Sequence, residues 1–229
     1  MPDTPSPAPT PRQRRKEARP QELLDAALAL FVEKGFAATR SEEVAARAGV
    51  SKGTLYLYYP SKEELLKAVI RQNLSRLLAD GEGIAERFQG STADLLATLL
   101  RTWWDQVGDT PAGGIHKIML AEVGNFPEIA EFYEREVIVP AHRLMSKTLQ
   151  RGVDRGEFRP VDAAEATHVL IAPLIFLALH KHSFGQCPFG AELAPSRLID
   201  AQIDIVLHGL QVPDRAPATP ANPPSARKA

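Results

Sequence analysis

A short cluster of polar and aromatic side chains has the chemistry needed to meet nucleic acid. Lys52 and Thr54 supply hydrogen-bond donors, Gly53 leaves the backbone bare for close approach, and Tyr56 and Tyr58 offer flat aromatic surface. Such donors bind phosphate oxygens and base edges. Lysine near a helix N-terminus opposes the helix dipole, and a phosphate beside it would reverse that penalty. We therefore expect the cluster to form an exposed binding surface.

A helix-turn-helix is predicted around this cluster. Thr39 and Glu42 are expected to form a capping box that opens a short helix, which Gly49 ends. Ser51 is expected to cap a second short helix, which Pro60 stops. Two short capped helices joined by a glycine turn match the motif whose second helix enters the DNA major groove.

Longer helices are predicted on both sides of the motif. Pro20 suits the first turn of a helix whose apolar stripe runs from Leu24 to Phe31 and which Gly35 ends. On the other side, a helix over about residues 62–80 follows a second capping box. We expect this helix to connect the motif to the rest of the chain and to act as a lever.

Residues 20–70 resemble the DNA-binding region of the TetR (tetracycline-repressor-like) family of bacterial transcriptional regulators. The segment AGVSKGTLYLYYPSKEEL carries the most specific part of the resemblance. Family members use the remainder of the chain, which matches in length and helical character, for ligand binding and dimerisation. The resemblance implies that DNA is contacted by Arg40, Ser41, Glu42, Lys52, Gly53, Thr54, Tyr56, Tyr58 and Lys62. Many members have an apolar residue at position 41.

Each of these residues also has an ordinary structural explanation. Lys52 and Lys62 could be solvated lysines, and the capping role already explains Glu42. Tyr56 and Tyr58 could be core aromatics that leave their hydroxyls wet. Because positions two apart on a helix do not share a face, we expect at least one of the two tyrosines to be exposed.

Charge is unevenly distributed along a nearly neutral chain. The 27 Lys and Arg residues against 28 Asp and Glu give a formal net charge of -1. Residues 1–76 carry 13 basic and 9 acidic side chains, a net of +4, whereas residues 77–229 carry 14 and 19, a net of -5. Such asymmetry indicates an end that faces nucleic acid. Much of the excess lies in segment 12–19, for which we expect a solvated tail, with a DNA-binding arm as the alternative.

Proline and apolar spacing set the expected domain limits. Residues 1–20 and 213–229 hold 11 of the 19 prolines and almost no large apolar residues. Apolar spacing elsewhere is helical, which predicts an all-α fold. We expect a disordered basic tail at 1–19, a helix-turn-helix DNA-binding domain at 20–70, a helical ligand-binding and dimerisation domain at 71–212 and a disordered tail at 213–229.

The second domain is predicted to be a helical bundle with an effector pocket. Its helices are expected at 92–107, 115–123, 128–152, 163–181 and 195–210, and Pro140 and Pro173 should kink or break two of them. Apolar pockets between bundle helices are typical small-molecule sites. We expect a small-molecule effector to contact Trp103, Trp104, His116, Met119, Leu120, Phe126, Phe132, Tyr133, Met145 and Phe176. The alternative for each is an ordinary core position.

The last two helices carry more apolar residues than one buried stripe needs, which predicts a symmetric interface. The resemblance implies the same, a homodimer built from a four-helix bundle. Recognition helices in such a dimer must lie about 34 to 36 Å apart to enter successive major grooves.

Several classes of protein are excluded by composition. His180, His182 and Cys187 lack further ligands at a useful spacing, so we expect neither a metal nor a cofactor. The longest apolar run, 169–179, has 11 residues and is expected to be a buried helix segment rather than a membrane span. With no signal-peptide pattern and one cysteine, a soluble cytoplasmic protein is expected.

The function expected from these features is a ligand-responsive transcriptional regulator. We expect a dimer that represses by binding a pseudo-palindromic operator and that a small apolar or amphipathic effector releases. A transcriptional activator and a helical small-molecule-binding or interaction protein are the alternatives. Catalytic motifs such as G-x-S-x-G, H-E-x-x-H and the Walker loop are missing from the sequence, so an enzyme is not expected.

Overall fold

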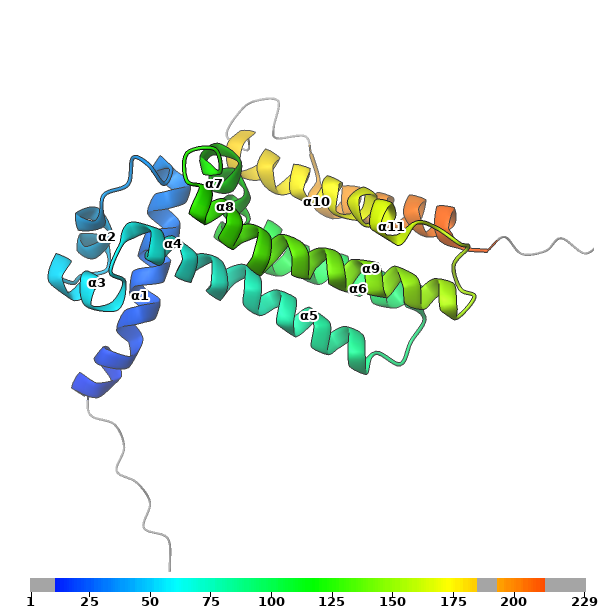
Figure 1. Ribbon diagram of the computed structural model, residues 1–229, viewed down its shortest axis with the longest axis horizontal. Helices are drawn as coiled ribbons and strands as arrows, with labels where there is room; N and C mark the ends of the chain where they lie inside the picture. The colour runs from blue at the N-terminus through cyan, green and yellow to red at the C-terminus, as the bar shows by residue number, and fades with distance from the viewer. Residues whose placement is uncertain (1–10, 185–192, 213–229) are drawn as a thin grey trace, which may run out of the picture.

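The computed structural model describes residues 11–184 and 193–212, and every regular element in these ranges is helical. The expectation of an all-α chain is confirmed, since an isolated bridge between Phe158 and Gln211 is the nearest approach to a strand there. Figure 1 shows an elongated molecule with a small group of helices at the N-terminal end and a longer bundle beyond it.

The small N-terminal group, which we call the head, packs four helices around one core. Its helices are α1 (Pro11–Lys34), α2 (Ser41–Arg47), α3 (Lys52–Tyr58) and α4 (Lys62–Ile70). Phe31 and Phe36 are fully buried and meet edge to face, with ring centres 5.3 Å apart. Leu23, Leu55 and Leu66 are equally buried, so each helix except α2 places a large side chain in this core, and α2 adds smaller ones.

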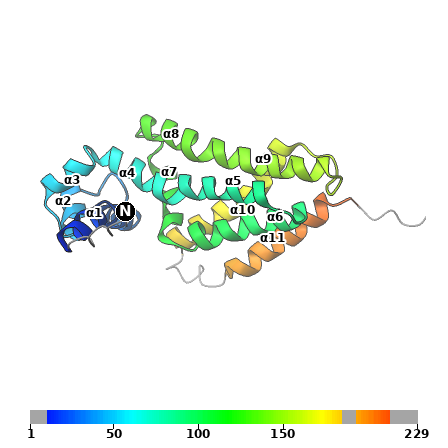
Figure 2. The same ribbon diagram turned by 90° about the horizontal axis from the view of Figure 1, so that it is seen from below.

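The bundle contains the remaining helices. They are α5 (Arg76–Arg87), α6 (Thr92–Trp103), α7 (Gly114–Glu122), α8 (Pro127–Tyr133), α9 (Val139–Asp154), α10 (Ala163–Phe184) and α11 (Pro195–Leu210). Irregular helical turns extend or join several of them, namely η1 (Arg71–Ser75), η2 (Trp104–Gly108), η3 (Pro111–Gly113) and η4 (Glu134–Ile138). Figure 2 shows that α9 and α11 lie on opposite sides of the bundle, with α5, α6 and α10 between them.

The first helix begins at Pro11, earlier than the start that we predicted at Pro20. Proline is well placed at the first helical position, and the segment that follows Pro11 consists mostly of Arg, Lys, Glu, Gln and Ala, which favour helix. Pro20 is accommodated inside α1. The first tail, expected to be disordered over 1–19, is helical from Pro11 onward. Residues 1–10, the second expected tail at 213–229 and Cys187 lie outside the described residues.

Pro140 and Pro173, the two prolines expected to disturb bundle helices, are accommodated without ending those helices. Pro140 lies in the first turn of α9, directly after the π-helical turn η4, which shifts the backbone hydrogen bonds that the ring would otherwise break. Pro173 lies inside α10, which continues unbroken from Ala163 to Phe184. Of the predicted kink or break at Pro173, the break is therefore excluded, and the disturbance at Pro140 is a local π turn.

One continuous core crosses the boundary expected at residue 70. The helical path runs without interruption from α4 through η1 into α5. Head residues such as Phe31 and Leu66 belong to the same buried cluster as Ile115, Met119 and other side chains of η2, α7 and α8. A second cluster fills the far end of the bundle. The head is thus packed onto the bundle through apolar contact and is not merely tethered to it.

The contact between α1 and α7 requires a glycine. A Cβ at Gly114 would lie 2.5 Å from Cγ2 of Val32, a stiff β-branched side chain. We expect Gly114→Ala to lower the free energy of unfolding by about 1 to 3 kcal/mol, because the two helices must separate. Urea unfolding measures this loss. Gly209→Ala is the control, since nothing lies within 4 Å of its Cβ position, and an unchanged midpoint for Gly114→Ala would contradict the close approach.

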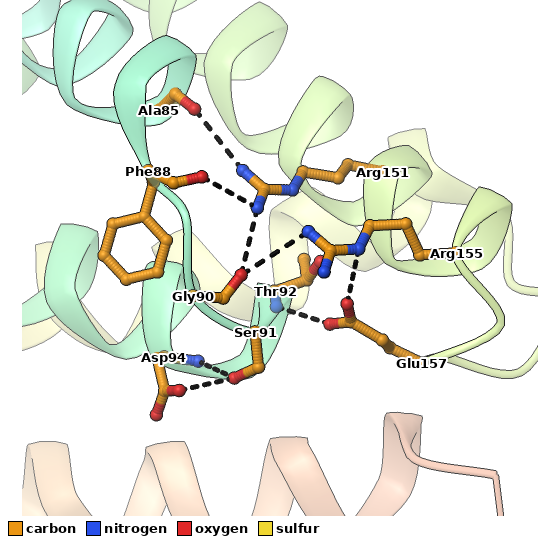
Figure 3. A network of polar contacts seen from close by, with 9 residues as sticks. All are labelled: Ala85, Phe88, Gly90, Ser91, Thr92, Asp94, Arg151, Arg155 and Glu157. Atoms are coloured by element: carbon orange, nitrogen blue, oxygen red, sulfur yellow. Dashed lines mark hydrogen bonds and ion pairs between the residues drawn. The ribbon is translucent and has the colours of Figure 1, made fainter.

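A polar network closes the end of the bundle far from the head. Arg151 of α9 donates to the carbonyl oxygens of Phe88 and Gly90 at 3.1 Å each, where α5 ends (Figure 3). Glu157 accepts from the Thr92 amide at the start of α6 and pairs with Arg155 at 2.7 Å. Burial opposes ionisation of Glu157, but these partners outweigh it and lower the pKa of the carboxyl. The network fixes the α5–α6 connection against α9.

Candidate DNA interface and effector cavity

The turn between α2 and α3 has the geometry of a helix-turn-helix. Gly49 adopts φ +67°, in the left-handed region that glycine tolerates best. The Val50 amide donates to the Ala45 carbonyl at 2.9 Å and closes the turn. Val44 and Leu55 are fully buried and hold the two helices together.

The first turn of α3 is capped as predicted and presents an open surface. Ser51 Oγ accepts from the Thr54 amide at 3.1 Å and lies 2.9 Å from the Thr54 hydroxyl. Lys52 and Gly53 are exposed, Thr54 is half-buried, and Tyr56 is 39% exposed. A Cβ at Gly53 would meet only Ser51 Oγ, at 3.8 Å. Packing within the protein therefore does not explain the glycine, whereas the approach of a large partner would.

Lys52 is held in place by two neighbours. Its ammonium group pairs with the Glu42 carboxylate and lies 5.6 Å from the centre of the Tyr56 ring. The hydrogen bond between Lys52 and Glu42 lowers the pKa of the Glu42 carboxyl and raises the pKa of the Lys52 ammonium group. Both groups are largely exposed, and such pairs contribute little to stability. A phosphate can therefore replace Glu42 as the partner of Lys52 at small cost.

The capping box of α2 uses other residues than predicted. The Arg40 amide donates to Glu43 Oε2 at 3.1 Å, so the pairing of Thr39 with Glu42 was wrong by one residue. The Thr39 hydroxyl instead donates to the Gly35 carbonyl at 2.7 Å, because the end of α1 leaves that oxygen without a helical partner. This arrangement leaves Glu42 free to meet Lys52.

The remaining expected DNA contacts differ in exposure. Arg40 is exposed, but Ser41 is only 8% exposed, so little of the Ser41 side chain is open to a partner. Tyr58 is half-buried against the head core. Leu57 is 82% exposed on α3. Sequence reasoning missed Leu57 because a leucine in a short helix is ordinarily expected to be buried in the core. Leu57 is two residues from the buried Leu55, and residues two apart on a helix do not share a face, so this spacing could have indicated its exposure.

Lys62 occupies a different place from the phosphate contact that the resemblance implies. Its ammonium group donates to the carbonyls of Phe36, Ala37 and Thr39 at 2.9 to 3.1 Å. It also lies 4.5 Å from the centre of the Phe36 ring. All three N–H donors of the lysine are therefore used to hold the loop between α1 and α2.

Glu122 holds the same loop from the bundle side. Its carboxylate accepts from the Ala37 amide at 3.1 Å and from Asn125 Nδ2 at 3.3 Å. Glu122 is 7% exposed and lies at the end of α7. Sequence reasoning did not identify Glu122, since its partner is far away along the chain and no local pattern marks it. The loop thus joins the head to α7.

A cavity of about 480 Å³ lies in the bundle between α5, α6, α7, η4, α9 and α10. Of the ten residues expected to contact an effector, six line it: Trp103, His116, Met119, Leu120, Tyr133 and Met145. Leu120, Val123 and Ile138 are lining residues that are also exposed, so the mouth opens between α7 and the start of α9.

The other four residues lie elsewhere. Trp104 is buried in the far core, and Phe126 packs edge to face on Phe36 of the head, with ring centres 5.0 Å apart. Phe132 is buried in the shared core, with the Arg71 guanidinium 4.6 Å from its ring centre. Phe176 is 56% exposed on α10. Helical spacing in the sequence shows which residues share a helix face. It does not show whether that face lies against the cavity, the core or solvent.

Two ionisable groups in the cavity wall are strongly shifted. Burial, with a smaller contribution from nearby His182, lowers the pKa of His116 to about 4. Burial also raises the pKa of the Tyr133 hydroxyl. Both side chains are therefore uncharged at neutral pH, which keeps the wall apolar with a few hydrogen-bonding groups.

Several large apolar side chains of α10 and α11 are exposed in the single chain. They are Val169, Phe176 and Phe184 of α10 and Ile205 of α11. The run 169–179 was expected to be buried, and this is confirmed for the side of α10 that packs on the bundle, which includes Leu170, Leu174, Leu177 and Ala178. The opposite side of the run is exposed in the single chain. By length and composition alone α10 could cross a membrane, a property shared with helices of soluble proteins. Over the residues described, no group of three His, Cys, Asp or Glu side chains is placed to hold a metal ion.

Comparisons with known proteins agree with this geometry. Residues 23–69 match the family model described as bacterial regulatory proteins, tetR family, and residues 89–186 match the tetracyclin repressor-like C-terminal domain. The uncharacterized HTH-type transcriptional regulator YfiR of Bacillus subtilis is 31% identical over 156 residues, which are 67% of this chain and 75% of YfiR. The repressor KstR2 of Rhodococcus jostii is 27% identical over 91% of this chain and 98% of its own.

Solved structures share the fold across most of the chain. The fatty acid degradation regulator FadR of Bacillus halodurans superposes with a TM-score of 0.71 at 20% identity, covering 83% of this chain and 99% of that one. FadR of Bacillus subtilis, solved with stearoyl-CoA, gives a TM-score of 0.67 at 17% identity over 82% and 98% of the two chains. The relatives named here are transcriptional regulators, not enzymes.

Proposed function

The chain belongs to the TetR family of bacterial transcriptional regulators, and we propose that it acts as a dimeric repressor whose α3 surface reads an operator and whose cavity binds the releasing effector. It is a DNA-binding regulator of the helix-turn-helix type. Repression is the sign of regulation shared with its relative KstR2. The proposed place of action is the cytoplasm, where the DNA lies.

The observation that carries this proposal is that cavity and head share one set of buried side chains. Leu74, Val107, Met119 and Val137 line the cavity and also belong to the core that contains Phe31. A ligand that moves these side chains therefore displaces groups on which the head is packed. Close-packed interiors transmit such displacement because they hold few voids.

The proposed mechanism is a shift between two spacings of the heads. One spacing suits successive major grooves, about 34 to 36 Å apart, and the other does not. An effector that fits the cavity better in the second state lowers operator affinity by its differential affinity, typically about 1 to 3 kcal/mol. The continuous path α4–η1–α5 is the proposed lever, since it carries Leu66 of the head and Leu74 of the cavity wall.

The proposed dimer uses the exposed apolar face of α10 and α11. Side chains such as Phe176 and Ile205 are more than half exposed in the single chain, and contiguous apolar surface of this kind marks an interaction site. A second copy of the same face provides a self-complementary cover under two-fold symmetry. The same symmetry places two α3 helices on one operator.

Substitutions on α3 test the proposed DNA contact. We expect Lys52→Ala and Tyr56→Ala each to weaken operator binding in a mobility-shift assay with the gene's own upstream DNA. Lys52→Ala should also reduce the slope of log affinity against log salt by about 0.9 for each phosphate that the lysine no longer neutralises. Both side chains are exposed, so circular dichroism should show unchanged folding.

Lys147→Ala is the matched control for this experiment. Lys147 is an exposed lysine on α9, outside the head, and its removal should leave affinity and salt slope as in the wild-type protein. Undiminished binding by both α3 variants would remove α3 from the proposed interface.

A further inference from the structure

The wall of the bundle cavity contains no formally charged side chain. The described residues that line it are apolar apart from Thr102, Trp103, His116, Tyr133 and His142, and include no Asp, Glu, Lys or Arg. Desolvation by burial, together with nearby His168, holds the pKa of His142 below its ordinary value. An ion that entered this cavity would lose its hydration without gaining a counter-charge.

Three hydrogen-bonding side chains of the cavity wall lie close to one another. The His116 ring centre lies 5.5 Å from that of Trp103 and 6.5 Å from that of Tyr133. These residues come from α7, α6 and α8, the elements that lead towards the head. Most of the remaining lining is aliphatic, with Ile84 and Leu99 among its members, and its other polar residues are Thr102 and His142. The wall is therefore largely apolar with a few hydrogen-bonding groups.

His116 has unused hydrogen-bonding capacity. The ring is 5% exposed, and its buried Nδ1 has no partner among the described residues. Buried polar atoms are normally paired, and an unpaired one costs free energy. Because desolvation lowers the pKa of His116 to about 4, the ring at neutral pH is an uncharged imidazole with one N–H donor and one acceptor.

We propose that the effector is an uncharged, predominantly aliphatic or aromatic molecule with a single alcohol, phenol or carbonyl group, which hydrogen-bonds to His116 in the cavity wall beside Trp103 and Tyr133. This inference rests on the proposed function, in which the cavity is the regulatory site, and adds the chemical class of the ligand. A carboxylate or ammonium group would be buried without a counter-ion.

Direct binding without DNA tests the ligand class on the full-length protein. The probe is N-phenyl-1-naphthylamine, an uncharged dye that fluoresces in apolar sites, and the competitors are 1-dodecanol and dodecanoate at pH 7.4. We expect the dye to bind and dodecanol to displace it. Dodecanoate should bind at least about a hundredfold more weakly, because its charge must be desolvated.

Variants at position 116 test the hydrogen bond. His116→Phe keeps the ring and removes both nitrogens, so dodecanol should bind about tenfold more weakly. His116→Gln retains a donor and an acceptor and should recover most of that loss. His208→Phe is the matched control, because His208 lies on α11 with its side chain 76% exposed and does not line the cavity. Thermal unfolding confirms that each variant is folded.

The outcomes separate this inference from the proposed function. Dodecanoate binding as tightly as dodecanol, or failure of the dye to bind, overturns the ligand class without any reference to DNA. The comparison of dodecanol with dodecanoate on the wild-type protein tests whether the cavity excludes a charged ligand, even if a variant at position 116 does not fold. Failure of the wild-type protein to bind the operator in the mobility-shift assay would overturn the proposed function. The ratio of dodecanol affinity to dodecanoate affinity is measured without DNA and would stand as a separate result.

Discussion

Gly53→Asp is expected to abolish operator binding while leaving the protein folded. Gly53 is exposed in the first turn of α3, and a Cβ there would meet only Ser51 Oγ, at 3.8 Å. Aspartate near a helix N-terminus is favoured by the helix dipole, so the free protein should be at least as stable. Against DNA, the same carboxylate faces phosphate, and like charges in an interface cost several kcal/mol.

The expected loss in operator affinity is about 10⁴-fold, since a penalty of about 3 kcal/mol applies at each of the two heads of the proposed dimer and each 1.4 kcal/mol is tenfold. Fluorescence anisotropy with a labelled operator measures it. Gly124→Asp adds the same charge to a glycine with nothing within 4 Å of its Cβ position, in the loop after α7, and should bind DNA normally. Equal affinity for the two variants would contradict the placement of α3 in the groove.

Phe176→Glu is expected to convert the dimer to monomers. Phe176 is 56% exposed at the middle of the apolar face of α10, and the proposed interface buries it. In the proposed dimer, a glutamate there would bury one unpaired carboxylate from each chain, which is costly when desolvated. Sedimentation equilibrium should give the mass of one chain, against two for the wild-type protein.

Operator affinity should fall when dimerisation is lost. A dimer binds its second half-site as an intramolecular event, and loss of that linkage typically weakens binding by about 10² to 10⁴. Val139→Glu is the control, because Val139 is 44% exposed on α9, away from the proposed interface. A Phe176→Glu protein that still sediments as two chains would show that the interface lies elsewhere.

The head could be predicted from sequence because its signals are local. Ser51 caps α3 through its own neighbour Thr54, and the left-handed turn at Gly49 requires only the residue type. The start of α1 at Pro11 was missed, since a proline-rich composition before Pro20 obscured the strong helix formers between them. Local chemistry thus determines the helix-turn-helix motif but does not fix where the first helix of the head begins.

The cavity could be predicted only in part because it depends on distant packing. His116 and Tyr133 line it, whereas Phe132 has the same kind of helical spacing and is buried beside the Arg71 guanidinium of η1. The contacts of Lys62 also depend on distant packing. Its carbonyl partners belong to the loop between α1 and α2, and the sequence does not show that this loop lies beside α4. Faces can be predicted from periodicity, but the partner of each face comes from the tertiary structure.

Selection of binding sites from random-sequence DNA duplexes by the wild-type protein tests directly whether two α3 helices read one operator. Such a dimer should enrich a pseudo-palindrome whose half-site centres are about one helical turn, 10 to 10.5 base pairs, or a multiple of it apart. Lys52→Ala should enrich it less. No enrichment of any sequence, or enrichment of one without two related halves, would contradict operator reading by a dimer.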